Sequence, residues 1–98
     1  MNRNMNNNIN PSDFSILIVD DNATNTILLD AILKREKYKT LIARDGETAL
    51  QIMQEKHPDL VLLDLGLGGS TTVGVEICRH TKQSYPAVKV LIFTGEIL

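Results

Sequence analysis

The stretch Asp59-Leu60-Val61-Leu62-Leu63-Asp64 decides the fold of this chain. Four aliphatic residues follow one another without polar alternation, which is typical of a strand buried on both faces in a parallel sheet. The strand ends at Asp64 and runs into a loop that contains Gly66, Gly68 and Gly69. Ligands of parallel sheets lie outside the carboxyl ends of the strands, so Asp64 is placed for chemistry. A lone aspartate at the end of a strand is nevertheless more often a structural cap of a loop or helix.

The sequence on either side of this strand alternates between strand and helix patterns. Further strands are predicted over residues 16–19, a run rich in β-branched residues, and over the mostly apolar stretches 40–43 and 88–93. Helices are predicted over about residues 23–36, 47–56 and 74–84, the first capped by Asn22 or Thr24. The order β-α-β-α-β-α-β with short connections predicts right-handed crossovers and a parallel sheet with helices on both faces.

The second and third predicted helices each have one narrow apolar face, whereas the first has a wider one. The inward residues are predicted to be Ala49, Leu50 and Met53 in the second helix and Val75, Ile77 and Cys78 in the third. The first helix carries an apolar stripe wider than one sheet face requires, formed by Ala23, Ile27, Leu28, Leu29, Ala31, Ile32 and Leu33. This stripe suggests a second packing partner for the first helix.

Length and composition limit the class of protein. A chain of 98 residues, 43% of them hydrophobic, holds one small core, and a net charge of −2 offers no basic face for nucleic acid or anionic lipid. The single cysteine, Cys78, excludes an internal disulfide and a multi-cysteine metal site, and it is interpreted as a core or semi-buried helix residue in a reducing compartment. Neither a secretory signal nor a span of 18 to 20 apolar residues is recognisable, so we expect a cytoplasmic protein.

Residues 1–14 and 15–98 differ in character. The first stretch is rich in asparagine and is predicted to be a disordered leader, because polar low-complexity sequence buries too little surface to offset its ordering entropy. Residues 15–98 are predicted to form the single domain.

Polar groups follow three of the predicted strands. Asp20 and Asp21 follow the first strand, Asp64 ends the third, and Thr94 follows the fourth. If the first strand lies beside the third, these groups meet at the switch point of the sheet. Clustered carboxylates repel one another unless a cation neutralises them, and a hard divalent ion such as Mg²⁺ suits this donor set. A carboxylate beside such an ion can attack phosphorus to form an acyl phosphate.

Other sites are disfavoured by spacing. The glycine loop is not followed by the Lys-Ser/Thr of a P-loop, and Thr71 stands where a dinucleotide fingerprint needs its third glycine. His57 and His80 have no ligand partner at a suitable spacing and are interpreted as solvated residues.

Five segments of the chain resemble response-regulator receiver domains of two-component signalling. They are Ile16 to Asn22 with Asn25, Ala43 to Leu50, Pro58 to Leu65, Gly74 to Glu76, and Val90 to Gly95. The resemblance implies a three-layer, flavodoxin-like, doubly wound α/β fold with strand order 2-1-3-4. It also implies a signalling module and not an enzyme.

The resemblance further implies a role for each site residue. Asp64 would accept a phosphoryl group from a histidine kinase or phosphotransfer protein. Asp20, Asp21 and Asp64 would hold Mg²⁺, with the Gly66 carbonyl as a further ligand. Thr94 would be the switch hydroxyl that turns toward the phosphoryl group, and an output domain or a downstream protein would read the change.

The chain departs from the family pattern in two places. The loop over residues 66–73 is about two residues longer than usual and lacks the usual proline, so it has more backbone freedom. The fifth strand with its conserved lysine, and the helices around it, are not in the sequence, so we expect a truncated receiver with impaired switching. Residues 88–93 would then form an unpaired apolar edge, and self-association through this strand and helix 23–36 is predicted.

Two functions therefore remain open from the sequence. In the first, the chain is a phosphoacceptor receiver with Asp64 as the acceptor. In the second, it is a non-phosphorylated pseudo-receiver that binds a protein or self-assembles through its incomplete sheet edge.

Overall fold

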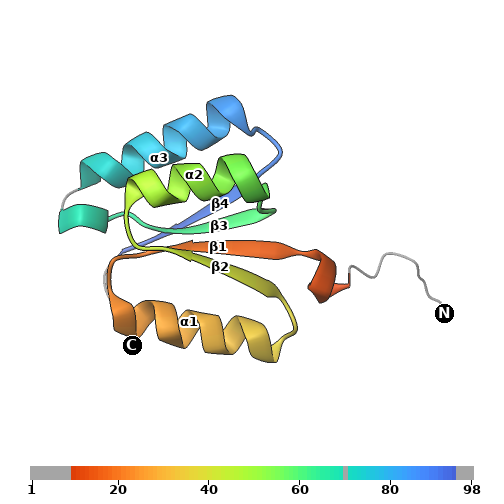
Figure 1. The fold of residues 1–98 in the computed structure, drawn as a ribbon. Helices are drawn as coiled ribbons and strands as arrows, with labels where there is room; N and C mark the ends of the chain where they lie inside the picture. Colours follow the sequence, from red (N-terminus) through yellow and green to blue (C-terminus); the bar gives the residue numbers. More distant parts are fainter. Residues whose placement is uncertain (1–9, 70, 95–98) are drawn as a thin grey trace.

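Four parallel strands form one sheet in the order β2-β1-β3-β4, as the computed structural model shows (Figure 1). The structure describes residues 10–69 and 71–94. The strands are β1 (Ser15–Val19), β2 (Lys39–Ala43), β3 (Leu60–Asp64) and β4 (Lys89–Phe93). Each strand boundary lies within one residue of its prediction, and the predicted strand order is confirmed.

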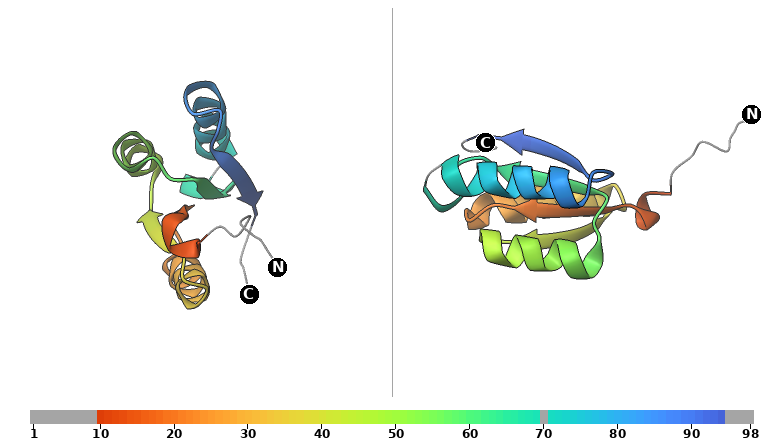
Figure 2. Two further views of the ribbon diagram at one scale, coloured as in Figure 1. Left: turned by 90° about the vertical axis from the view of Figure 1, so that its right-hand side faces the viewer. Right: turned by 90° about the horizontal axis from the view of Figure 1, so that it is seen from above.

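Helices cover both faces of the sheet and give a three-layer α/β arrangement. Helix α1 (Ala23–Arg35) lies on one face, and α2 (Gly46–Lys56) and α3 (Thr71–Ser84) lie side by side on the other (Figures 1 and 2). Two short 3-10 helices, η1 (Pro11–Asp13) and η2 (Leu67–Gly69), precede β1 and follow β3. This is the layering that short crossovers between parallel strands produce.

The larger part of the core lies between the sheet and the α2/α3 layer. Strand residues Leu17, Val19, Val61 and Leu63 alternate toward this layer, because neighbouring residues of a strand point to opposite faces. Here they form one buried cluster with Ala43, Ala49, Met53, Leu67 and Ile77. Ile16 and Ile18 are buried on the opposite face, so the central strand β1 is apolar on both sides, as predicted.

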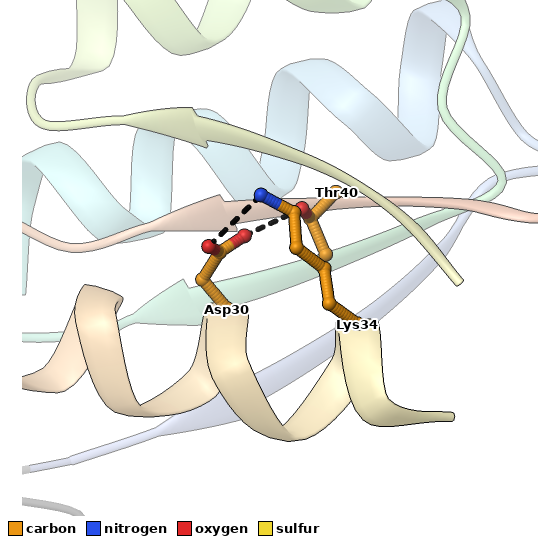
Figure 3. Close-up of polar contacts among 3 residues, drawn as sticks. All are labelled: Asp30, Lys34 and Thr40. Atoms are coloured by element: carbon orange, nitrogen blue, oxygen red, sulfur yellow. Dashed lines mark hydrogen bonds and ion pairs between the residues drawn. The ribbon is translucent and has the colours of Figure 1, made fainter. Parts of the chain in front are cut away.

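Helix α1 is fixed at its start and near its end. The side chain of Asn22 accepts a hydrogen bond from the Asn25 amide, so Asn22 and not Thr24 is the N-cap. Further along, Asp30 accepts from the Thr40 hydroxyl of β2 and forms an ion pair of 3.1 Å with Lys34 (Figure 3). The Asp30–Thr40 bond ties α1 to the edge strand of the sheet.

Helix α3 differs from its prediction in both start and inner face. It begins at Thr71, and Val75, which the sequence pattern predicts to point inward, is 43% exposed. Gly74 determines this orientation, because a Cβ at Gly74 would lie 2.8 Å from the Leu65 carbonyl oxygen. The helix therefore packs through Gly74, Ile77 and Thr81, at the three- and four-residue spacing of one helix face, and Val75 is turned away from it.

Several apolar side chains remain exposed on α1 and β4. Ile27 and Ile32 of α1 are 66% and 45% exposed, and Leu91 and Ile92 of β4 are 56% and 47% exposed. The first pair belongs to the wide stripe predicted for the first helix. Among the described residues, β4 pairs only with β3.

The structure describes residues 10–14 of the predicted leader, which include η1. Asn10 caps η1, and the ring of Phe14 packs edge-on against Tyr38 at a centroid distance of 5.9 Å. Residues 1–9 of that leader and Gly95 of the last motif lie outside the described residues. Cys78 is a free, half-buried cysteine.

Candidate functional site

The sheet brings the predicted polar residues to one end of neighbouring strands. Val19 is in register with Leu63, so Asp20 and Asp64 lie at the adjacent carboxyl ends of β1 and β3. Asp64 is in turn in register with Phe93, which places Thr94 directly beyond the end of β4. The convergence predicted from the sequence is therefore confirmed for these strand ends.

Asp20 is buried and held by two hydrogen bonds. Its Oδ1 accepts from the Asn22 amide at 2.9 Å, and its Oδ2 accepts from the Asn25 side-chain amide at 3.0 Å. The first turn of α1 thus orients a carboxylate that has no exposed surface. These two hydrogen bonds offset part of the free-energy cost of burying the polar carboxylate oxygens.

Asp21 is exposed and contacts the glycine loop. Its Oδ2 accepts a hydrogen bond from the Gly68 amide at 3.2 Å. Gly68 has a φ of +74°, a conformation that glycine adopts without strain. The carboxylate at the end of β1 and the loop after β3 are therefore directly linked.

Asp64 is only 8% exposed, and its surroundings disfavour the charged form. Burial raises the pKa of Asp64, and the nearby carboxylates of Asp20 and Asp21 raise it further. The Gly66 amide, which donates to Asp64 Oδ1 at 3.0 Å, opposes this increase in the pKa. A cation at this position would remove the repulsion that Asp20 and Asp21 exert.

The three aspartates form one compact donor set. Asp20, Asp21 and Asp64 each offer a carboxylate oxygen, and these oxygens all lie within 4.8 Å of one another. Carboxylate oxygens are the ligands that Mg²⁺ takes from proteins, and the ion usually keeps several waters as well. The residues present therefore fit a hard divalent cation.

Gly66 and Thr94 are the less constrained members of the predicted site. The Gly66 carbonyl oxygen already accepts from the Gly69 amide at 3.0 Å, which leaves one lone pair for another partner. Thr94 is exposed, and its hydroxyl makes no hydrogen bond to another described residue. The metal-ligand role of Gly66 and the switch role of Thr94 stay predictions.

Two contacts of the site do not follow from the sequence. The Asn25–Asp20 bond joins residues five positions apart. In the sequence Asn25 is noted only as part of the first receiver-like segment, and nothing there identifies Asp20 as its partner. The Gly68–Asp21 bond joins residues 47 positions apart. The sequence feature that relates to the Gly68–Asp21 bond is the high glycine content of the loop. Such a content indicates unusual backbone dihedral angles, but it does not indicate which residue the loop contacts.

The fold and the site define a doubly wound α/β protein with a cluster of three aspartates at the carboxyl ends of its central strands. The family model described as "Response regulator receiver domain" matches residues 16–97, so the chain belongs to that family. It is thus a receiver domain of two-component response regulators.

Individual relatives agree with this assignment. The chain is 40% identical over 80 residues to sporulation initiation phosphotransferase F of Bacillus subtilis, covering 82% of this chain and 63% of that protein. It is 38% identical over 80 residues to the nitrogen assimilation regulatory protein NtrX of Azorhizobium caulinodans, covering 82% of this chain and 18% of the relative. The chain therefore spans less than two thirds of the length of either relative.

Solved structures show the same fold. The receiver domain of NtrX from Brucella abortus has a TM-score of 0.73 and 34% identity over 79% of this chain and 64% of that one. A CheY-like receiver domain protein from Methanospirillum hungatei has a TM-score of 0.78 and 27% identity over 87% of this chain and 66% of that one. Within the described part of the chain, none of the helices has the length and apolar character needed to cross a membrane.

Proposed function

We propose that Asp64 is the phosphoacceptor of this receiver domain. The observation that carries the proposal is the set of three carboxylates within 4.8 Å, one of which, Asp64, ends the central strand β3. Such a set is costly to maintain without a cation, and it lies where ligands of parallel sheets bind.

Phosphoryl transfer to Asp64 is an in-line displacement at phosphorus. A carboxylate oxygen of Asp64 forms a bond to phosphorus, and the bond from phosphorus to the donor breaks with its electron pair leaving on the donor. The donor would be a phosphohistidine of a histidine kinase or phosphotransfer protein, so the broken bond is P–N. The Gly66 amide donates a hydrogen bond to Asp64 Oδ1 and so holds the carboxylate in one orientation. A fixed orientation lowers the entropy cost of bringing the carboxylate and the phosphorus atom together.

Asp20, Asp21 and Asp64 would hold Mg²⁺, with the Gly66 carbonyl as a further ligand. When bound, the ion neutralises charge on the carboxylates and on the phosphoryl oxygens. Asn22 and Asn25 keep Asp20 in place for this role, and the hydroxyl of Thr94, beyond the end of β4, would donate to a phosphoryl oxygen. The module would act as a switch and not as an enzyme that turns over a substrate.

The signal would pass through the loop between β3 and α3. This loop bonds to Asp21 through Gly68 and is followed by α3, whose Gly74 packs against the backbone of Leu65. A change in charge at Asp64 therefore acts on residues that touch α3. An output domain or a downstream protein would read the resulting change, with the cytoplasm as the expected compartment.

A second function is favoured by the exposed apolar residues. Ile27, Leu91 and Ile92 are each nearly half exposed or more, and β4 has one strand partner among the described residues. Sheet edges of this kind pair with other chains. The chain would then serve as a binding or self-assembly module, without phosphorylation at Asp64.

Phosphate incorporation separates the two functions. The folded chain is incubated with Mg²⁺ and acetyl phosphate, and its intact mass is compared with that of D64N and of D13N, which removes an exposed aspartate outside the cluster. The proposal predicts one added phosphoryl group in the unmodified chain and in D13N, and none in D64N. Saturation with Mg²⁺ without any mass increase would contradict it.

A further inference from the structure

A groove lies between α2 and α3, apart from the three aspartates. It encloses about 550 Å³ and is lined by Gly46, Glu47 and Leu50 of α2 and by Thr72, Val73, Glu76, Ile77 and His80 of α3. Its volume is within the range of protein pockets that hold ligands or inserted side chains. These lining residues are distinct from the acidic cluster.

The floor of the groove is apolar. Leu50 and Val73 are half-buried, and Ile77 is buried beneath them as part of the core. Gly46 lets α3 approach closely at one end, because a Cβ at Gly46 would lie 3.0 Å from Val73 Cγ1. The groove therefore offers apolar side chains supported by the rigid core.

The rim of the groove is acidic. Glu47 stands on the α2 side, and it makes no hydrogen bond or ion pair with any described residue. Glu76 stands on the α3 side and pairs at 2.7 Å with Arg79, a bond exposed enough to exchange for another partner. Among the described residues that line the groove there is no lysine or arginine, and the one titratable base is His80, whose ring contacts Tyr85.

We propose that this groove docks a short amphipathic helix of a partner protein, with apolar residues entering between α2 and α3 and Lys or Arg residues flanking them. An apolar groove between two parallel helices is suited to bind a third helix, whose apolar residues at positions i, i+3 or i+4, and i+7 enter the groove. The two rim carboxylates select a basic helix and repel nucleic acid or an anionic membrane. The proposal does not depend on phosphorylation of Asp64.

A synthetic probe tests this proposal. A fluorescein-labelled 14-residue peptide of leucine and lysine, patterned as an amphipathic helix, is titrated with the chain, alongside the same peptide with glutamate in place of lysine. The double variant E47K/E76K should weaken the Kd of the lysine peptide by about tenfold. The charge-matched control E36K/E55K changes two other exposed glutamates, which lie outside the groove, and it should leave the Kd within about twofold.

The binding position is mapped by amide chemical shifts in ¹⁵N-labelled chain. The proposal predicts the largest changes over residues 46–50 and 72–80. It is overturned if the lysine peptide does not bind at millimolar concentration, if E47K/E76K and E36K/E55K weaken binding equally, or if the glutamate peptide binds as tightly as the lysine peptide. It is also overturned if the largest chemical-shift changes occur around the exposed residues Ile27 and Leu91. A further contradicting result is a dimer in sedimentation that uses this groove and dissociates when the peptide is added, because the occupant would then be a second copy of the chain.

Discussion

The Gly68 amide donates to a carboxylate oxygen of Asp21 across 3.2 Å, and this bond connects the two loops that frame Asp64. It occupies one oxygen of the exposed member of the acidic cluster. The loop leads to α3, whose Gly74 packs against the backbone of Leu65, the residue that follows Asp64. Changes at the cluster and changes in α3 packing should therefore both be measurable in the stability of the chain.

Replacing Asp64 by asparagine should stabilise the chain in the absence of divalent ions. The pKa of Asp64 is raised above its ordinary value of 3.8, so the ionised carboxylate destabilises the folded state at neutral pH. The D64N variant should therefore melt a few degrees higher at pH 7, and this advantage should disappear as the pH falls through the raised pKa toward 3.8. D13N is the control and should not change the Tm, as measured by circular dichroism.

Magnesium should raise the Tm of the unmodified chain. A ligand that binds only the folded state stabilises it by about 2.7 kcal/mol at a concentration of about 100 Kd. D21N should abolish most of this gain, because it removes a donor from the cluster, and it should not unfold the chain, because Asp21 is exposed. An equal magnesium shift in D21N would place the ion elsewhere.

Gly74→Ala should destabilise the chain more than Gly69→Ala. A Cβ at Gly74 would meet the backbone of Leu65 at 2.8 Å, so α3 must move, at a cost of about 1–3 kcal/mol. Gly69 has a φ of +82°, and a Cβ there would meet nothing within 4 Å, so its substitution costs only about 1 kcal/mol of backbone strain. Urea unfolding of the two variants measures the difference, and equal midpoints would be inconsistent with the α3 packing.

Thr40→Val should weaken the link between α1 and β2 in a pH-dependent manner. The Thr40 hydroxyl is the main cause of the lowered pKa of Asp30, with Lys34 contributing and burial opposing. A lowered carboxylate pKa gives stability that is present above 3.8 and lost as the pH falls through the lowered pKa. The free energy of unfolding of the T40V variant should be about 1 kcal/mol lower than that of the unmodified chain at about pH 7. In acid, the Tm values of the two chains should converge.

The exposed residues of β4 and α1 should make this 98-residue chain self-associate. Sedimentation velocity should show oligomers that increase with concentration, and L91K should shift them toward monomer, since Leu91 is 56% exposed. K89E, which changes an exposed charged residue of the same strand, serves as the control. A stable monomer at high concentration would argue against assembly through this edge.

Most of the fold can be predicted from the sequence. Aliphatic runs end at Asp20, Asp64 and Thr94, and the alternation of strands and helices predicts a parallel sheet with these residues at the carboxyl ends of its strands. The strand order that brings these ends together follows from the resemblance to receiver domains, and the structure has that order. Pro58, which is buried just after α2, also marks the end of that helix correctly.

The parts that could not be predicted depend on close packing between distant segments. The start of α3 at Thr71 lacks a clear signal in a glycine-rich loop, and the prediction for Val75 is wrong because the close approach of Gly74 to Leu65 sets the orientation of the helix. The Gly68–Asp21 bond requires the loop to reach a strand end 47 residues away. Local patterns contain no information on such contacts.

The most direct test of the phosphoacceptor proposal is chemical trapping at Asp64. Borohydride reduces an aspartyl phosphate to homoserine, so chain treated with Mg²⁺ and acetyl phosphate is reduced, digested and sequenced by mass spectrometry. Homoserine at position 64, absent when Mg²⁺ or the phosphodonor is omitted, is the predicted result. Homoserine at Asp20 or Asp21 instead, or an unmodified Asp64 after saturation with both reagents, would contradict the assignment of Asp64 as the acceptor.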